Sequence, residues 1–149
     1  MKVLDYSINE SLGFWVYRMH TQGVAVLRRA FQAKGYDITP EQWSLMVRLR
    51  ENQGIKQRQL GKKAYKDRHN TTRILNQLHR RGYIERRPDG RDKRAYNLFL
   101  TKLGCAVQEA LTPVVVAHYA DAFKGLTEHD LAAMRRILEH IVGNLDERL

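Results

Sequence analysis

Apolar side chains recur every three or four residues along most of the chain, which is the spacing of one face of an α-helix. This pattern predicts six helices: over 7–33, from 40 to just before 54, over 56–64, over 68–81, for roughly 20 residues after 101, and from about 128 onward. In the first of these, apolar residues cover more than one helix face. We therefore expect that helix to be buried by more than its own domain.

Residues that favour helix ends support these ranges. Ser7 and Glu10 have the spacing of a capping box, and so do Thr39 and Gln42. Asp67 is expected to cap the fourth helix. Gly82 is expected to end that helix, because glycine adopts the left-handed conformation that often follows a helix.

After Gly82 the apolar period changes from about 3.6 residues to two, which is typical of a β-strand. Residues 84–86 and 95–100 alternate in this way, and the turn sequence Pro-Asp-Gly-Arg-Asp separates them at 88–92. We therefore expect a mainly α fold with a small β-hairpin.

The positive charge is concentrated in residues 56–94. This segment holds 14 of the 26 lysines and arginines but only four of the 16 acids. Its net charge of +10 equals that of the whole protein, so the two ends of the chain are together neutral. Such a local excess is typical of a nucleic-acid-binding face, and it outweighs the alternative of an ordinary solvated surface.

The helices predicted over 40–53, 56–64 and 68–81, followed by a basic hairpin, have the order of a winged helix-turn-helix. In that fold the last of the three helices, here 68–81, enters the major groove of DNA. The candidates for contact lie in the first turns of the 68–81 helix, where arginine, asparagine and threonine side chains can read base edges: Arg68, His69, Asn70, Thr71, Thr72 and Arg73. For Asn70 and Thr72, hydrogen bonding to the start of their own helix is an equal alternative.

The hairpin is the predicted wing, and its tip residue Arg91 is the candidate for the minor groove, with contact to phosphates alone as the alternative. The cations that flank the tip would lie along the DNA backbone: Arg86, Arg87, Lys93 and Arg94. Asp89, Gly90 and Asp92 are expected to shape the turn, because phosphates would repel a carboxylate.

Three segments together resemble the MarR (multiple antibiotic resistance regulator) family of transcription factors: NTTRILNQLHRRGYIERR, DGRDKRAYNLFLT and LTKLG. The resemblance extends over essentially the whole chain. It implies one compact chain with a winged helix-turn-helix at 37–100 and dimerisation helices at 1–36 and 101–149. It also implies a homodimer that binds a pseudo-palindromic site on double-stranded DNA, most simply as a repressor, and is released by a small effector such as an aromatic or phenolic compound.

The effector pocket implied by the family would combine apolar walls with a few polar groups, and six residues fit that description: Trp15, Met19, His20, Trp43, Met46 and Arg50. Arg50 suits a carboxylate or phenolate ligand. The alternative is that these residues are plain core. Cys105 could sense oxidation, but a small buried hydrophobe is the simpler interpretation.

Other classes of protein find little support. The chain has no apolar run long enough to span a membrane, and its first residues do not resemble a signal peptide. A single cysteine fits a reducing cytoplasm. The family resemblance implies a bacterial or archaeal protein at the nucleoid. The sequence shows neither metal-ligand spacing nor a catalytic motif, so we expect no cofactor and no enzyme. An RNA-binding protein with the same winged helix remains the rival, and it would need exposed aromatic residues such as Tyr65 for stacking on bases.

Overall fold

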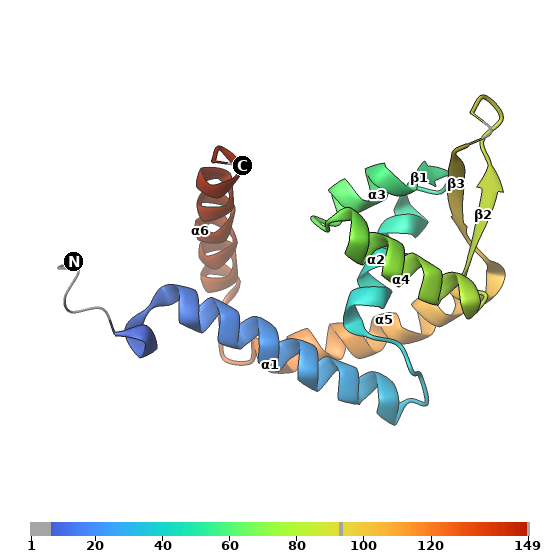
Figure 1. The fold of residues 1–149 in the computed structure, drawn as a ribbon. Helices are drawn as coiled ribbons and strands as arrows, with labels where there is room; N and C mark the ends of the chain where they lie inside the picture. Colours follow the sequence, from blue (N-terminus) through green and yellow to red (C-terminus); the bar gives the residue numbers. More distant parts are fainter. Residues whose placement is uncertain (1–6, 93, 149) are drawn as a thin grey trace. The chain divides into compact units, whose positions relative to one another are not determined.

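The computed structural model describes residues 7–92 and 94–148. It is mostly helical with a small antiparallel sheet (Figure 1), as the periodicity predicts. The elements in chain order are η2 (Ile8–Glu10), α1 (Leu12–Ala33), α2 (Pro40–Glu51), β1 (Ile55–Lys56), α3 (Gln57–Lys63), α4 (Arg68–Arg80), β2 (Ile84–Pro88), β3 (Tyr96–Leu100), α5 (Lys102–Ala122) and α6 (Glu128–Asp146). The chain forms two compact units, residues 1–118 and 119–149, which are described separately.

The first helix starts later than expected. The structure has a short 3₁₀ turn at Ile8–Glu10, and α1 begins only at Leu12. The predicted capping box of Ser7 and Glu10 is wrong, because the Ser7 side chain caps no amide. The Trp15 indole donates to the carbonyl oxygen of Asn9 at 3.0 Å. A continuous helix would use that oxygen for a backbone amide four residues later.

The predicted ends of α2 and α4 are confirmed. Thr39 and Gln42 form a complete capping box at the start of α2. The Asp67 carboxylate accepts from the Asn70 amide at the start of α4. Gly82 has a φ of +72°, the left-handed conformation that ends the helix.

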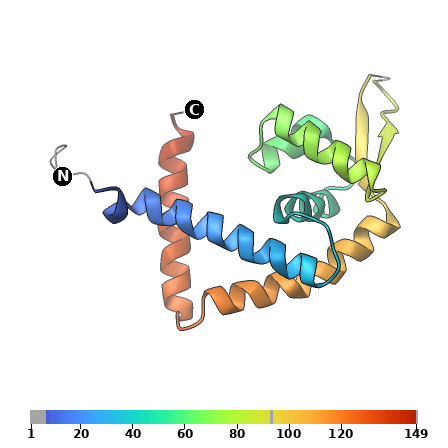
Figure 2. The same cartoon turned by 60° about the horizontal axis from the view of Figure 1, so that its bottom comes forward.

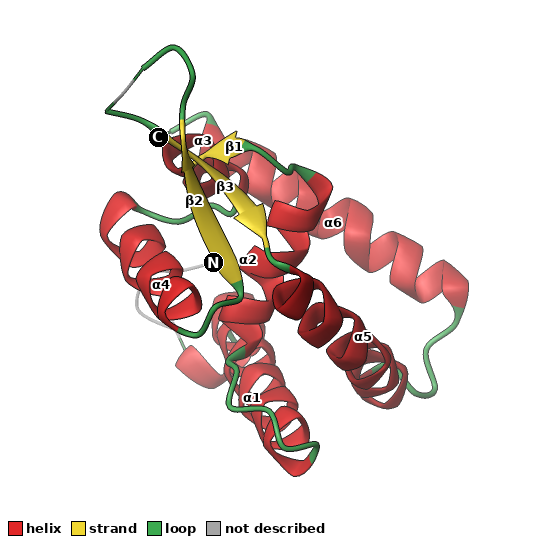
Figure 3. Cartoon of the chain, turned by 90° about the vertical axis from the view of Figure 1, so that its right-hand side faces the viewer, coloured by secondary structure: helices red, strands yellow, loops and turns green. Residues whose placement is uncertain are grey.

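The sheet contains one strand more than the hairpin predicts. Its order is β1-β3-β2, and both pairs are antiparallel (Figure 3). In the hairpin, Ile84 pairs with Leu100 and Pro88 with Tyr96. The additional strand, β1, pairs Ile55 with Leu98. Two residues are too short to show a period of two, so sequence patterning could not reveal this strand.

The core of the first unit lies where α2, α3 and α4 meet the sheet and α5. Its side chains are almost completely inaccessible to solvent, and the largest of them are Phe31, Leu45, Met46, Leu49, Leu60, Ile74, Leu75, Leu78, Ile84, Leu98 and Leu111. The N-terminal half of α1 behaves differently, since Leu12, Trp15 and Tyr17 are exposed. Figure 2 shows α1 as a long rod whose C-terminal end leads through a short loop to α2.

In the second unit, α6 begins with a capping box between Thr127 and Asp130. Ile137, Ile141 and Leu145 are exposed along this helix. In the part of the chain that the structure describes, no helix is long and apolar enough to cross a membrane.

Candidate nucleic-acid interface

The start of α4 presents some of its predicted contact residues to solvent and holds others. Arg68, His69 and Arg73 are exposed. Asn70 is half-buried, and its side-chain amide donates to the Asp67 carboxylate at 2.5 Å. That carboxylate also accepts from the Asn70 backbone amide, and these two bonds, the backbone one first, lower the pKa of Asp67. Asn70 therefore makes the local helix-start bond in this structure.

Thr71 lies away from the surface. Its side chain is 1% exposed, and its hydroxyl donates to the carbonyl oxygen of Asp67 at 2.8 Å. It packs against Gly61 of α3, where an added Cβ would be 2.9 Å from the Thr71 hydroxyl. The buried residues Ile74, Leu75 and Leu78 continue the same helical stripe. Thr71 therefore belongs to the packing between α3 and α4 and is not exposed for contact with DNA.

Thr72 is fixed from two sides. Its hydroxyl donates to the Arg68 carbonyl oxygen and accepts from the Gln57 side-chain amide, both at 2.8 Å. Gln57 is the first residue of α3, so this contact joins the paired helices on the side that faces the hairpin. The sequence analysis did not select Gln57, because only the fold brings it beside Thr72.

The wing carries most of its predicted cations in exposed positions. Arg91 and Arg94 are exposed at the hairpin tip. Arg87 lies over the Phe99 ring, 4.2 Å from its centroid, and also pairs with Glu85. Arg86 is half-buried and donates to the Asn76 side chain at 2.7 Å, which ties β2 to α4. Lys93, the remaining candidate, lies outside the described residues.

Two aspartates organise the hairpin tip. The Asp89 carboxylate accepts from the backbone amides of Arg91 and Asp92, at 2.8 and 3.0 Å. These bonds are the main reason that the pKa of Asp89 is lowered, and Lys56 at 3.4 Å contributes further. Asp92 accepts from the Arg94 amide at 2.9 Å. Gly90 is exposed within this tip, with open space where a side chain would be.

A basic hollow lies between α4 and the wing. Its volume is about 720 Å³. The residues that line it include four cations and no acid, namely Lys56, Gln57, Arg58, Thr72, Asn76, His79, Arg86, Arg94, Ala95, Tyr96 and Leu98. Four of the 14 cations of residues 56–94 are thus brought together between the helix and the hairpin, where they could neutralise DNA phosphates.

The six candidates for an effector pocket are divided in the structure. Trp15, Met19 and His20 are exposed on the N-terminal half of α1, whereas Met46 is fully buried in the core. The Trp43 indole is half-buried and donates to the Gln108 carbonyl oxygen at 3.3 Å.

Arg50 lies at a separate hollow between α2 and α5. It donates to the side chains of Gln108 and Glu109, at 2.5 and 2.6 Å. The hollow has a volume of about 590 Å³, and Arg50 alone of the six lines it, with Val47, Glu51, Gln108, Glu109, Thr112 and Pro113. Among the described residues, no cluster of histidine, cysteine or acidic side chains has the arrangement of a metal site.

Cys105 is half-buried near the start of α5 and packs against the core. This placement agrees with a small apolar role for its side chain. Redox sensing through Cys105 stays a prediction.

Comparison with known proteins identifies the module. Residues 38–96, which run from just before α2 to the first residue of β3, match the family model described as the MarR family. Over this segment the chain is similar to the MarR family. Among curated MarR-like relatives, the uncharacterised HTH-type transcriptional regulator YybA of Bacillus subtilis is 28% identical over 113 residues, covering 76% of this chain and 75% of YybA. The transcriptional repressor MprA of Escherichia coli is 26% identical over 131 residues, covering 87% and 74% of the two chains.

Solved structures agree with this similarity to the MarR family. A crystal structure of a cysteine-to-serine mutant of MarR from E. coli, complexed with operator DNA, matches with a TM-score of 0.81 and 26% identity. The match covers 87% of this chain and 92% of that chain. The fold is therefore the winged helix-turn-helix fold of MarR-type transcriptional regulators.

Proposed function

We propose that the protein is a repressor that binds a pseudo-palindromic site on double-stranded DNA, with the first turns of α4 in the major groove and the hairpin tip in the minor groove. The observation that carries this proposal is the basic hollow between α4 and the wing, which has four cations and no acid in its lining. MarR, a similar protein, has been crystallised with operator DNA, and MprA is named as a repressor.

Within this surface the residues have different roles. Arg68, His69 and Arg73 are exposed and can face base edges or phosphates, and Thr72 presents a side chain that Gln57 holds in place. Arg91 is the minor-groove residue, while Arg86, Arg87 and Arg94 follow the backbone. Asp89 and Asp92 hold the tip in shape.

We propose further that the protein acts as a homodimer. Supporting this, α1 and α6 carry exposed apolar side chains that a lone chain leaves in water, namely Leu12, Trp15, Val16, Tyr17 and Met19 on α1 and Ile137, Ile141, Val142 and Leu145 on α6. Two copies of α4 would have to lie about 34–36 Å apart to enter successive major grooves.

A small anionic effector would release the DNA by favouring a different spacing between the two copies of α4 in the dimer. A ligand with equal affinity for both spacings would cause no release. The hollow beside Arg50 is the site we favour, because the Arg50 side chain is 41% exposed and its guanidinium contacts Gln108 and Glu109 of α5.

The experiment that tests DNA binding measures the affinity for a fluorescent duplex, obtained by selection from a random pool, at several salt concentrations. Wild-type protein should lose affinity steeply as salt rises. Arg73→Ala should cost about 1–3 kcal/mol and relax discrimination at one base pair, whereas Arg91→Ala should weaken binding and reduce the preference for A·T pairs.

Arg136→Ala is the matched control, since it removes one positive charge from α6. Unchanged duplex affinity in both Arg73→Ala and Arg91→Ala would contradict the proposal. Preferential binding of a single-stranded RNA of equal length would support the RNA-binding alternative, for which Tyr65 and Tyr96 are exposed aromatic residues.

A further inference from the structure

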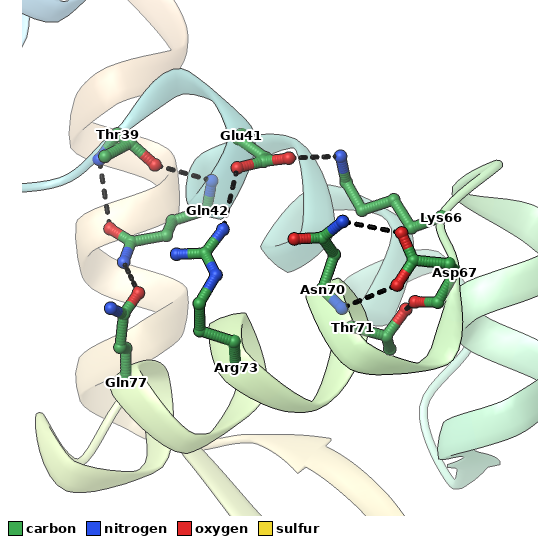
Figure 4. Close-up of polar contacts among 9 residues, drawn as sticks. All are labelled: Thr39, Glu41, Gln42, Lys66, Asp67, Asn70, Thr71, Arg73 and Gln77. Atoms are coloured by element: carbon green, nitrogen blue, oxygen red, sulfur yellow. Dashed lines mark hydrogen bonds and ion pairs between the residues drawn. The ribbon is translucent and has the colours of Figure 1, made fainter.

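An acidic side chain from α2 lies against the start of α4, the helix proposed to enter the major groove and called the reading helix below. The Glu41 carboxylate has one oxygen 2.5 Å from the Lys66 ammonium group and the other 3.7 Å from the Arg73 guanidinium (Figure 4). Lys66 immediately precedes the cap of α4, and Arg73 is one of its exposed side chains. Glu41 thus joins two cations of a surface that is otherwise strongly basic.

The backbone around Glu41 is held firmly. Thr39 and Gln42 close the capping box on either side of it. Gln42, only 4% exposed, donates from its side-chain amide to the Gln77 side chain at 2.9 Å. Neighbouring residues of α2 therefore contact residues one turn apart on α4, at Arg73 and Gln77. Figure 4 shows the Arg73 guanidinium between the Gln42–Gln77 pair and Asn70.

The two ion pairs have different consequences. At 2.5 Å the Lys66 ammonium group makes a charge-assisted hydrogen bond, and its side chain is 22% exposed, so its charge is largely neutralised by Glu41. At 3.7 Å the Arg73 contact is an ion pair without a hydrogen bond. The guanidinium therefore keeps its N–H donors for a base edge, while attraction to the nearby carboxylate favours one direction of the side chain.

A carboxylate on this surface also repels phosphate. The repulsion between the Glu41 carboxylate and phosphates is the same for every DNA sequence, so it lowers the affinity for non-specific DNA. At the correct site, the contact between Arg73 and its base offsets this loss of affinity. An acid in this position therefore widens the difference between specific and non-specific affinity.

We propose that Glu41 is a positioning residue that sets sequence discrimination, by orienting Arg73 and by neutralising Lys66 so that Lys66 makes no phosphate contact. This inference rests on the proposed DNA-binding function. It assigns to an acid of α2, which lies outside the reading helix and the wing, control over how strictly the reading helix selects its sequence.

The test replaces Glu41 with glutamine, which keeps the shape of the side chain and removes its charge. Glu128→Gln is the matched control, because Glu128 is also an exposed acid in the first turn of a helix that begins with a capping box. The probes are a duplex selected by the wild-type protein from a random pool and a mixed-sequence duplex of the same length.

Glu41→Gln should bind the mixed-sequence duplex several-fold more tightly than wild type, while its preference for the selected duplex falls. The slope of log affinity against log salt should steepen by about 0.9, because one more cation becomes available to a phosphate. Glu128→Gln should match wild type in both respects. In an Arg73→Ala background, Glu41→Gln should cause no further loss of preference at the base pair that Arg73 reads.

A merely structural role would change the thermal midpoint and leave the salt slope and the base preference as in wild type, and that result would overturn the inference. A second variant covers the case in which Glu41→Gln does not fold. Lys66→Ala should leave the salt slope of the otherwise wild-type protein unchanged, whereas Arg68→Ala should reduce its steepness by about 0.9. Equal reductions in Lys66→Ala and Arg68→Ala would also overturn it.

Failure of the underlying function gives a different result. A wild-type protein that selects no sequence and binds duplex without salt dependence would contradict DNA binding itself. Selection by the wild type together with identical behaviour of Glu41→Gln and Glu128→Gln would contradict the role of Glu41 alone.

Discussion

Gly104 of α5 lies directly against the carbonyl oxygen of Tyr83, so closely that a Cβ on Gly104 would be 2.0 Å from that oxygen. The same oxygen accepts a hydrogen bond from the Thr101 amide at 3.1 Å. The start of α5 is therefore seated on the chain that enters β2, and the contact leaves no room for any side chain at position 104.

Gly104→Ala is expected to lower the free energy of unfolding by about 1–3 kcal/mol, because backbone must shift to admit the methyl group. Gly13→Ala is the control: its Cβ would be 3.5 Å from the Ser11 hydroxyl, an ordinary contact, and alanine favours a helix by up to about 1 kcal/mol. Urea unfolding of both variants measures the difference. Equal stabilities would show that the α5–β2 contact yields easily.

The hydrogen bond between Gln42 and Gln77 should couple α2 to α4 energetically. Each single change to alanine removes the same bond, so the double variant should lose less stability than the two single losses combined. The expected coupling is about 0.5–1.5 kcal/mol, measured by a double-mutant cycle in urea. Strict additivity would mean that the bond adds nothing to the packing of the two helices.

Thr71 and Thr72 should respond differently to valine, although they are neighbours. Thr71→Val removes the hydroxyl that donates to the Asp67 carbonyl oxygen, and it should cost about 0.5–1.5 kcal/mol of stability without changing duplex affinity. Thr72→Val should weaken duplex binding, because its hydroxyl lines the basic hollow. A fall in duplex affinity for the folded Thr71→Val variant would return that residue to the contact surface.

The hairpin tip should lose order in acid. The pKa of Asp89 is lowered in the folded protein, chiefly by the amides of Arg91 and Asp92, from an ordinary value of 3.8. A lowered folded pKa means that the stabilisation is fully present above pH 3.8 and is lost as pH falls through the folded pKa. NMR shifts of the Arg91 and Asp92 amides should follow this titration in wild type.

Asp89→Asn is the control for that titration, and in this variant the two amides should show no such step. A wild-type titration at or above pH 3.8 would contradict the lowered pKa.

Arg50 should be required for binding of an anionic aromatic ligand if the hollow between α2 and α5 is the effector site. Benzoate or 4-hydroxybenzoate at about 100 times its dissociation constant should stabilise wild type by about 2.7 kcal/mol, seen as a rise in the thermal midpoint. Arg50→Ala should abolish that rise, whereas Arg48→Ala, on the same helix, should retain it. An equal rise in all three proteins would place the ligand elsewhere.

Local chemistry explains which parts of the fold were predictable. Thr39, Asp67 and Gly82 mark helix ends through bonds and backbone conformations that involve only residues nearby in the chain. The hairpin was predictable for the same reason, since its period of two and its turn sequence are both local. The late start of α1 was not, because it depends on the side chain of Trp15 reaching back to Asn9.

The site was predictable to the level of its charge and its elements, and less so for single residues. Thr71 could have been recognised as buried, because 71, 74, 75 and 78 have the spacing of one helix face. Gln57, Asn76 and Glu41 gave no such signal. Their partners lie 15, 10 and 25 or more residues away, and only the packing of α2, α3 and the wing around α4 brings them together.

The two-residue strand β1 ties the wing to the helix that follows it. Ile55 and Lys56 pair with β3, Lys56 reaches Asp89 near the hairpin tip, and Gln57 reaches Thr72 on α4. These contacts hold the hairpin to β1 and the start of α3 to α4, so they oppose movement of the hairpin relative to α4. An adjustment to a narrower or wider DNA groove would therefore move α4 and the hairpin together.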